Sequence, residues 1–304
     1  MRNTIKMHFG LRVNIFFIIC LVIFNSHSSV LAKDSDAYFA SLQERLIEDG
    51  FDENWIKKIY KKREIAFEAK LISKYFVHSE ATLDYDQFST DHSIALARKY
   101  LEKHEDDLKS AEKEYGVDKE LITAVILVET RFGAYTGRSP ILNTLSTMSS
   151  LADLWVRGEF WEMKEFPGEE KPERQKFEKI AYFKSKWAYT ELKAFLEYVQ
   201  QEEMDPVKIK GSMAGAMGLA QFMPTNIPIY AIDGNSDGSI DLFHHSDSIA
   251  SVANFLRHFG WQPGISKINA EKVIYYYNHS DYYVEAVLKV YNILNGGKWI
   301  SIYF

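Results

Sequence analysis

The segment that decides the fold is ELITAVILVETRFGAYTG, residues 120–137. It is almost unbroken apolar sequence from Leu121 to Val128, and Glu129 follows before any turn signal. A stretch without a polar face is typical of a helix buried on all sides. Apolar surroundings raise the pKa of a carboxyl toward the range useful for a general acid. Glu129 is therefore a candidate catalytic residue; the alternative is a helix-terminal glutamate that turns to solvent or pairs with a nearby base.

Helical patterns precede this segment. From Tyr38 to Tyr115 apolar residues recur at helical spacing, and Gly50 and Gly116 are the natural stops. Asp118 stands where the N-cap of the next helix is expected.

Beyond the segment, loops alternate with further helical patterns. Residues 158–179 are charged and contain two prolines, which predicts a surface excursion. Helical patterns follow over residues 187–200, 248–258 and 282–294. Strand signals are scarce and nothing repeats at a fixed period, so the predicted fold class is mainly α.

Residues 1–32 have the pattern of a secretory signal peptide. Basic residues precede an apolar run over residues 13–24, and a small-residue cleavage site ends at Ala32. The run is shorter than the roughly 20 residues that span a bilayer, which disfavours an uncleaved membrane anchor. Two isoleucines precede Cys20 where a lipid-attachment signal needs a small residue, which disfavours a lipid anchor. We expect a periplasmic or secreted protein, cleaved near Ala32.

The composition of the mature chain limits its stabilisation and its partners. The single cysteine lies within the predicted signal peptide, so no disulfide is expected in the mature chain. Removing residues 1–32 takes away three basic and no acidic residues, leaving 33 basic residues against 42 acidic ones. This negative balance argues against nucleic acid as a partner.

Residues 231–247, AIDGNSDGSIDLFHHSD, contain an EF-hand-like loop. The oxygen-bearing residues at its first, third and fifth positions are Asp233, Asn235 and Asp237. Gly238 supplies the sharp turn at the sixth, and hard oxygen ligands at alternate positions suit calcium. His244 replaces the glutamate expected at the twelfth, and Asp247 would close a longer loop. We interpret the loop as a structural calcium site; the alternative is a polar turn that binds nothing.

Two further segments carry groups suited to a ligand. The first is GSMAGAMGLAQFMPT, residues 211–225, whose small residues let a backbone lie close to another chain, including a polymeric ligand. Ser212 and Gln221 would hydrogen-bond such a ligand, while Phe222 would line a cleft or fill the core. The second is YYYNHSDYYVEAVL, residues 275–288, whose aromatic residues pack against sugar rings or against a core. No partner of its histidine has metal-ligand spacing, so zinc is not expected.

The order and content of these four segments resemble the lytic murein transglycosylase B family of peptidoglycan-cleaving enzymes. The resemblance covers roughly Phe51 to Leu294. It implies a mainly α fold: a lysozyme-like catalytic core with an EF-hand-like calcium loop and an N-terminal helical extension. The expected divisions are a signal peptide (1–32), an N-terminal helical region (33–114) and a catalytic domain (115–304) with the loop at 233–247.

The resemblance also implies an activity. Such an enzyme cleaves the β-1,4 bond between N-acetylmuramic acid and N-acetylglucosamine without water, because the muramoyl 6-hydroxyl attacks its own anomeric carbon and leaves a 1,6-anhydro product. A hydrolase needs two carboxylates, whereas here one glutamate would serve as acid and then as base. The expected partner is the glycan strand of peptidoglycan, bound by a monomer; the sequence does not identify any cell-wall synthesis or division protein as a further partner.

Motif positions in the family imply a role for individual residues. Glu129 is the implied catalytic residue. The implied substrate-binding residues are Ser212, Gln221, Phe222, Tyr277, Asn278 and Tyr283. The implied calcium ligands are Asp233, Asn235, Asp237, the backbone carbonyl of Ser239, and Asp247.

Two departures from the family pattern keep other functions open. Leu127 stands where the family usually has glycine, and Phe255 where a tyrosine of the cleft is common. The excursion at 158–179 has no counterpart that aligns. The alternatives are a lysozyme-type hydrolase, a catalytically weak peptidoglycan-binding scaffold and, third, a calcium sensor.

Overall fold

Helices make up almost all of the regular structure in residues 35–77, 84–163 and 173–297, which the computed structural model describes. The first helices are α1 (Ser35–Glu48), α2 (Glu53–Tyr60), α3 (Ala69–Val77), α4 (Asp91–Lys103) and α5 (Glu105–Tyr115), with a short 3-10 helix η3 (Asp86–Ser89) before α4. The next are α6 (Lys119–Thr130), α7 (Ile141–Ser150), α8 (Leu154–Glu162) and α9 (Arg174–Gln201). The last are η4 (Pro224–Asn226), α10 (Ile227–Tyr230), α11 (His245–His258), α12 (Lys267–Tyr277) and α13 (Asp281–Leu294). The predicted mainly α fold is confirmed.

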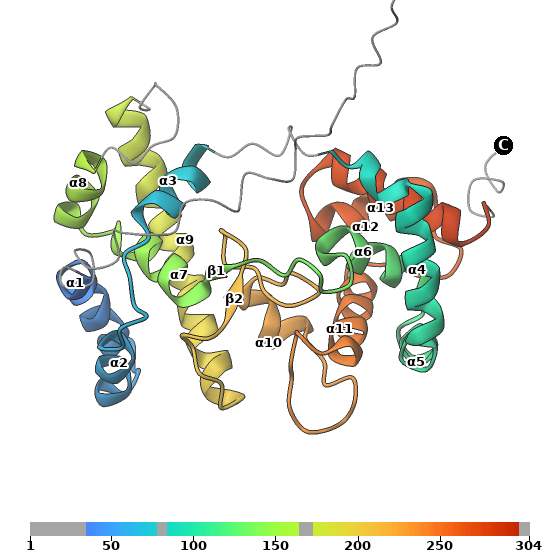
Figure 1. The fold of residues 1–304 in the computed structure, drawn as a ribbon, viewed down its shortest axis with the longest axis horizontal. Helices are drawn as coiled ribbons and strands as arrows, with labels where there is room; N and C mark the ends of the chain where they lie inside the picture. The colour runs from blue at the N-terminus through green and yellow to red at the C-terminus, as the bar shows by residue number, and fades with distance from the viewer. Residues whose placement is uncertain (1–34, 78–83, 164–172, 298–304) are drawn as a thin grey trace, which may run out of the picture.

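These helices form two groups with loops and a small sheet between them (Figure 1). One group contains α1, α2, α3, α7, α8 and α9, and the other contains α4, α5, α6, α11, α12 and α13. The sheet pairs β1 (Ser139–Pro140) with β2 (Lys210–Gly211) in antiparallel register. The predicted N-terminal helical region contributes to both groups, because α4 packs on α6 and α5 packs on α11. The predicted division at residues 114 and 115 therefore does not coincide with the separation of the two groups.

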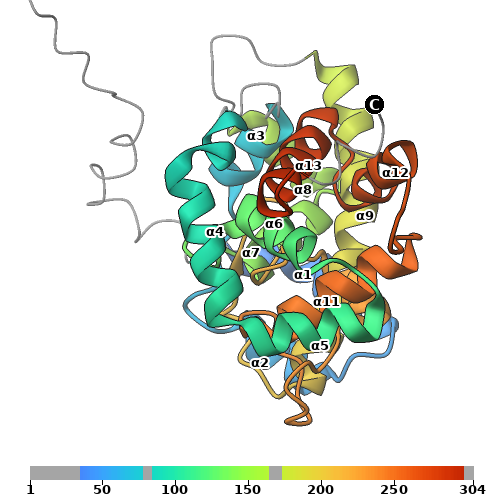
Figure 2. The same ribbon diagram turned by 90° about the vertical axis from the view of Figure 1, so that its right-hand side faces the viewer.

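Helix α6 lies at the centre of the second group (Figure 2). Nine of its twelve residues are buried, as the apolar sequence predicts, and it packs against α4, α5, α11 and α13. Asp118 occupies the predicted N-cap position, but its carboxylate accepts a hydrogen bond from the indole of Trp261 at 2.9 Å. Glu112 instead accepts the N–H of Lys119 at 3.1 Å. The first turn of α6 is thus held by α5 and by Trp261 in the loop after α11.

The structure corrects the predicted surface excursion. Residues 158–162 belong to α8 and residues 174–179 belong to α9, so both ends of the predicted excursion are helical. Residues 164–172, like residues 1–32 of the predicted signal peptide, lie outside the described residues. Helix α9 buries Phe177 and Ala181 and begins at Arg174, about three and a half turns before the predicted start at Trp187. The predicted helices around α11 and α13 are confirmed. No helix within the described ranges is long and apolar enough to cross a membrane.

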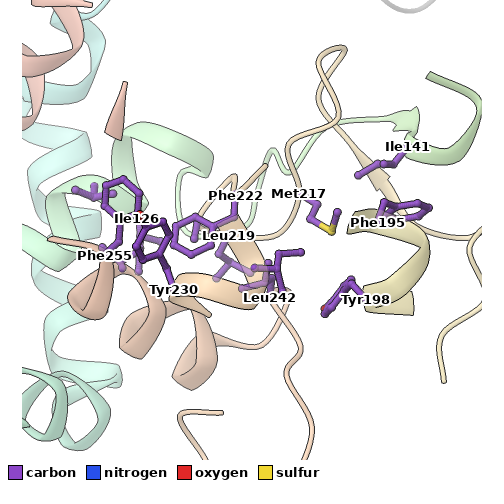
Figure 3. Packing of buried hydrophobic residues seen from close by; sticks show 14 of the residues in the cluster. Ile126, Ile141, Phe195, Tyr198, Met217, Leu219, Phe222, Tyr230, Leu242 and Phe255 are labelled. Atoms are coloured by element: carbon purple, nitrogen blue, oxygen red, sulfur yellow. The ribbon is translucent and has the colours of Figure 1, made fainter. Parts of the chain in front are cut away.

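The loop between β2 and η4 joins the cores of the two groups. Its side chains Met217, Leu219 and Phe222 are 0–3% exposed. Figure 3 shows Phe222 beside residues of the second group and Met217 on the side of Phe195 in α9. The buried residues of both groups therefore form one continuous apolar cluster.

The small residues of this loop serve close contacts within the protein itself. Gly218 has φ +74°, and a Cβ atom there would lie 2.3 Å from the carbonyl oxygen of Leu242. The next residue, Leu219, donates its N–H to that same carbonyl at 2.8 Å. From the sequence we expected these small residues to let the backbone lie close to a polymeric ligand. At Gly218 the close approach is instead to the chain's own backbone, because the cores of the two groups of helices pack together through this loop.

We expect Gly218→Ala to destabilise the fold more than Gly264→Ala. Both glycines have φ +74°, but Gly264 has open space where Cβ would lie. Gly264→Ala, the control, should lower the free energy of unfolding by about 1–2 kcal/mol, which is the penalty for placing a residue with a Cβ in the left-handed conformation. Gly218→Ala adds a clash with backbone that cannot move without disrupting the loop. Urea unfolding of both variants would measure the difference, and equal destabilisation would contradict the close-packing role.

Candidate active site

Glu129 is the second-last residue of α6 and is only partly exposed. The helix ends immediately after it, because Arg131 and Phe132 have φ values of 49° and 61°, which no α-helix continues. The hydroxyl of Tyr283 donates to Glu129 Oε1 at 2.6 Å. Residues 154 positions apart in the sequence thus meet at the end of the buried helix.

Two tyrosines from the α12–α13 hairpin lie beside the carboxylate. Their rings are stacked, with centroids 6.3 Å apart, and Tyr283 is 2% exposed. The Tyr277 hydroxyl donates to the carbonyl of Ala220 at 2.6 Å, which ties α12 to the loop between the two groups. Burial first, and then the charge of Glu129, raise the pKa of both tyrosines well above the ordinary value. Tyr283 therefore stays protonated, and a donor to Glu129, far into the alkaline range.

Thr130 fastens the end of α6 to the same loop. Its buried hydroxyl donates to the carbonyl of Leu219 at 3.0 Å and accepts the N–H of Gly133 at 3.1 Å. The bond spans 89 residues of sequence, so the position of Glu129 and that of the loop are coupled. Sequence reasoning did not identify Thr130, since a threonine after a glutamate carries no pattern of its own.

Gln221 and Ser212 lie in the loop and hold its conformation. Gln221 has φ 48°, and its amide nitrogen donates to the carbonyls of Gly218 at 2.8 Å and Thr136 at 3.2 Å. This leaves its amide oxygen to accept from a ligand. The Ser212 hydroxyl oxygen accepts the N–H groups of Ala214 and Ala216 at 3.2 and 3.0 Å, and its hydrogen remains a donor.

Phe222 lies in the core behind the tyrosines. Its side chain is 1% exposed, and its ring centroid is 5.8 Å from that of Phe255 and 6.0 Å from that of Tyr277. The sequence left open whether Phe222 lines a cleft or fills the core, and this geometry shows core packing. Phe255 in turn meets the Tyr277 ring edge-on at 4.8 Å (Figure 3 shows Phe222 and Phe255). Asn278 is the C-cap of α12, between the two helices that carry the tyrosines.

Leu127, the other departure from the family pattern, is fully buried. It precedes Glu129 by two residues, and side chains two residues apart point to different faces of a helix. Its extra volume is therefore accommodated in the core, away from the carboxylate.

A segment from the N-terminal region completes the surroundings of Glu129. Arg131, directly after α6, donates to the side chain of Gln87 and lies 5.3 Å from the ring of Phe88. Lys289 of α13 forms an ion pair with Asp86 at 2.9 Å. Tyr85 is close enough to Tyr283 to contribute to the raised pKa of that tyrosine. Sequence analysis did not identify this segment, because no local pattern shows that it packs against a residue more than 40 positions later.

The acidic loop has the hydrogen bonding of a tight turn. The Asp233 carboxylate accepts the N–H groups of Asp237 and Gly238 at 3.2 and 2.8 Å. Asn235 accepts the same Asp237 N–H at 3.0 Å, and the Asp237 carboxylate accepts the N–H of Ser239 at 2.9 Å. The three predicted side-chain oxygen donors are therefore gathered around one turn. Gly238 has φ +90° at this turn, as the sequence predicts.

Asp247 joins the two ends of this loop. It is 1% exposed, and its two carboxylate oxygens accept the N–H groups of Gly234 at 3.0 Å and Asp241 at 2.7 Å. The donor set of the loop consists of carboxylate, amide and carbonyl oxygens, which fits a hard cation and not zinc. Within the described residues, no three His, Cys, Asp or Glu side chains form a group that could hold a metal ion.

The sequence profile of the transglycosylase SLT domain family matches residues 34–271 of this chain. Over 178 residues the chain is 35% identical to the membrane-bound lytic murein transglycosylase B of Escherichia coli (strain K12). That match covers 59% of this chain and 41% of the relative, so it accounts for less than half of the relative's length. The family profile ends before Tyr277, Asn278 and Tyr283, whose place in the site rests on the geometry described above.

Two solved structures have a similar fold. SltB3 from Pseudomonas aeruginosa, in complex with NAG-anhNAM-pentapeptide, has a TM-score of 0.68 at 17% identity, covering 86% of this chain and 80% of that chain. Slt35 from Escherichia coli, in complex with calcium, has a TM-score of 0.64 at 22% identity, covering 87% of this chain and 93% of that chain. These likenesses agree with the fold class expected from the sequence.

Proposed function

This chain belongs to the transglycosylase SLT domain family, and we propose that it is a peptidoglycan lytic transglycosylase with Glu129 as its catalytic residue. The observation that carries the proposal is the 2.6 Å hydrogen bond from Tyr283 to Glu129 at the end of the buried helix α6. The relative from E. coli is a lytic murein transglycosylase, which supports the same reaction class for this chain.

In the proposed reaction, Glu129 acts first as an acid. It transfers its proton to the glycosidic oxygen as the bond from the muramoyl anomeric carbon to that oxygen breaks, through a transition state with positive charge on the sugar ring. The carboxylate then accepts the proton of the muramoyl 6-hydroxyl, whose oxygen bonds to the anomeric carbon. Glu129 returns to its protonated form, and no water is consumed. One carboxylate therefore suffices, because the substrate supplies the nucleophile.

The neighbouring side chains orient the carboxylate and the glycan in this proposal. The Tyr283 hydroxyl donates to one oxygen of Glu129 and fixes its direction. The free amide oxygen of Gln221 and the hydroxyl hydrogen of Ser212 would bind sugar hydroxyl or acetamido groups. Asn278 would add a contact from the hairpin, and Tyr277 would hold the hairpin to the loop. The complex of SltB3 with an anhydromuramoyl ligand supports a glycan strand as the ligand of this site.

We also propose that the acidic loop binds structural calcium. Asp233, Asn235, Asp237 and the carbonyl of Ser239 would hold the ion, and Asp247 would ligate it while keeping the loop closed. The calcium complex of Slt35 supports this assignment. The ion would screen the repulsion between the carboxylates of the loop.

We also propose that the protein is exported. Peptidoglycan lies outside the cytoplasmic membrane, and the signal-peptide pattern of residues 1–32 would bring the enzyme to the periplasm or the exterior.

Product analysis tests the reaction directly. We expect the mature protein to release 1,6-anhydromuramoyl fragments from purified peptidoglycan, as detected by mass spectrometry. Glu129→Gln keeps the shape of the side chain but removes the acid, so it should abolish cleavage while sacculus binding remains. Reducing-end muramic acid without anhydro sugar would instead identify a lysozyme-type hydrolase. Equal inactivity of the wild type would identify a binding scaffold.

Tyr283→Phe tests the orientation of Glu129. We expect the rate of cleavage to fall by about 10²-fold, because a misdirected catalytic group costs roughly this factor, while binding to sacculi persists. The raised pKa of Tyr283 means that the wild-type hydroxyl stays protonated on the alkaline side, so loss of wild-type activity at high pH would not come from this group. Tyr182→Phe, at an exposed tyrosine of α9, is the matched control and should leave the rate unchanged. Similar rates for Tyr283→Phe and the wild type would contradict the role.

Calcium should raise the melting temperature of the mature protein, because a ligand that binds only the folded state stabilises it by about 2.7 kcal/mol at a hundredfold excess over its Kd. Differential scanning calorimetry with calcium and with a chelator would measure this. Asp237→Asn should lose most of the shift. An unchanged melting temperature at millimolar calcium would contradict the proposal that the acidic loop binds calcium. It would not affect the proposed reaction.

A further inference from the structure

The α12–α13 hairpin has a large apolar groove on its surface. The groove has a volume of about 1320 Å³, and both helices line it along their length. Ile268 and Tyr276 on α12 are 65% and 53% exposed, while Leu288 on α13 lies at its floor. Exposed apolar surface of this extent is unusual on a soluble protein unless something binds there.

The charges at the edges of the groove do not select a charged partner. Three lysines and three acidic side chains line it, so they balance. A polyanion or a strongly basic peptide would therefore gain little from long-range attraction. Apolar contact decides what binds.

The chain leaves α13 at one end of this groove. Asn292 and Ile293 line the groove, and their carbonyls accept the N–H groups of Gly297 at 2.9 Å and Gly296 at 3.3 Å. Both glycines have positive φ, 69° and 76° for Gly296 and Gly297, which ends the helix and turns the chain away from its axis. The residue before position 298 is thus hydrogen-bonded to the wall of the groove.

The sequence that follows suits an apolar groove. Residues 298–304, KWISIYF, lie outside the described residues, and five of the seven are apolar or aromatic. Seven extended residues span at most roughly 25 Å, which exceeds the roughly 16 Å length of an 11-residue helix such as α12. A segment tethered this closely also has a local concentration of about millimolar, which a free ligand must overcome.

We propose that residues 298–304 bind in the α12–α13 groove of their own chain and hold the hairpin in place. Tyr277 and Tyr283 belong to the same hairpin but do not line the groove, and their hydroxyls bond to Ala220 and Glu129, so the bound segment would support the position of the donor to Glu129. This inference does not depend on the reaction proposed above, because its readouts are protection and stability.

Hydrogen exchange of the intact protein tests the proposal. We expect Trp299→Ser together with Ile302→Ser to speed exchange of the α12 and α13 amides several-fold, and to lower the melting temperature by about 2–4 °C. Ile268→Ser in the groove should have the same effects. The matched control is Ile229→Ser, an isoleucine on α10 that is 60% exposed and outside the groove; it should leave hairpin exchange unchanged.

Combination and rescue separate binding from simple destabilisation. Ile268→Ser added to the two segment substitutions should change exchange no further, since both remove one interaction. The peptide KWISIYF, added to protein lacking residues 298–304, should restore protection. Wild-type exchange in the segment variant, additive effects, or equal effects of Ile268→Ser and Ile229→Ser would overturn the proposal. Protection that rises with protein concentration would also overturn it, because the occupant would then be a second copy.

Discussion

The hydrogen bond between Tyr283 and Glu129 depends on the burial of α6, nine of whose twelve residues are buried. Because residues 121–128 of that helix are buried on all sides, the next charged side chain, Glu129, emerges only where the core ends. A carboxylate in that place needs a donor, and the α12–α13 hairpin provides one at 2.6 Å. The packing of α4, α5 and α11 around α6 matters to the site mainly because it fixes where that carboxylate stands.

The loop between β2 and η4 connects this site to the rest of the molecule. It receives hydrogen bonds from Thr130 of α6 and Tyr277 of α12, and its apolar side chains enter the cores of both helical groups. Its glycines allow the backbone to pass within contact of other backbone segments. The same loop holds the backbone of Gln221 at a positive φ. The direction of its side-chain amide therefore depends on this backbone conformation as well as on the rotamer. Site and core are therefore built from one set of contacts.

The two departures from the family pattern have different consequences. Leu127 is buried within α6, on a different face of the helix from Glu129. Phe255 stands edge-on to Tyr277 inside an aromatic cluster, where a tyrosine hydroxyl would need its own partner. A phenylalanine at position 255 has no hydroxyl that needs a partner. Tyr277 still packs against its ring and donates its hydroxyl to the loop. Neither residue displaces the groups that the proposed reaction uses.

The sequence by itself determined the mainly α fold, the buried helix and the glutamate at its end, because apolar periodicity and its interruption are local properties of the chain. It also determined the positive-φ turn at Gly238, since only glycine adopts that conformation without strain. Tertiary structure alone decided that Glu112 and not Asp118 caps α6, that Phe222 lies in the core, and that Thr130 and the segment of Tyr85 adjoin the site. These facts depend on contacts between residues that are not neighbours in the sequence, from seven positions apart for Glu112 and Lys119 to 89 for Thr130 and Leu219, and a sequence pattern does not encode which partner a hydrogen-bonding group will find.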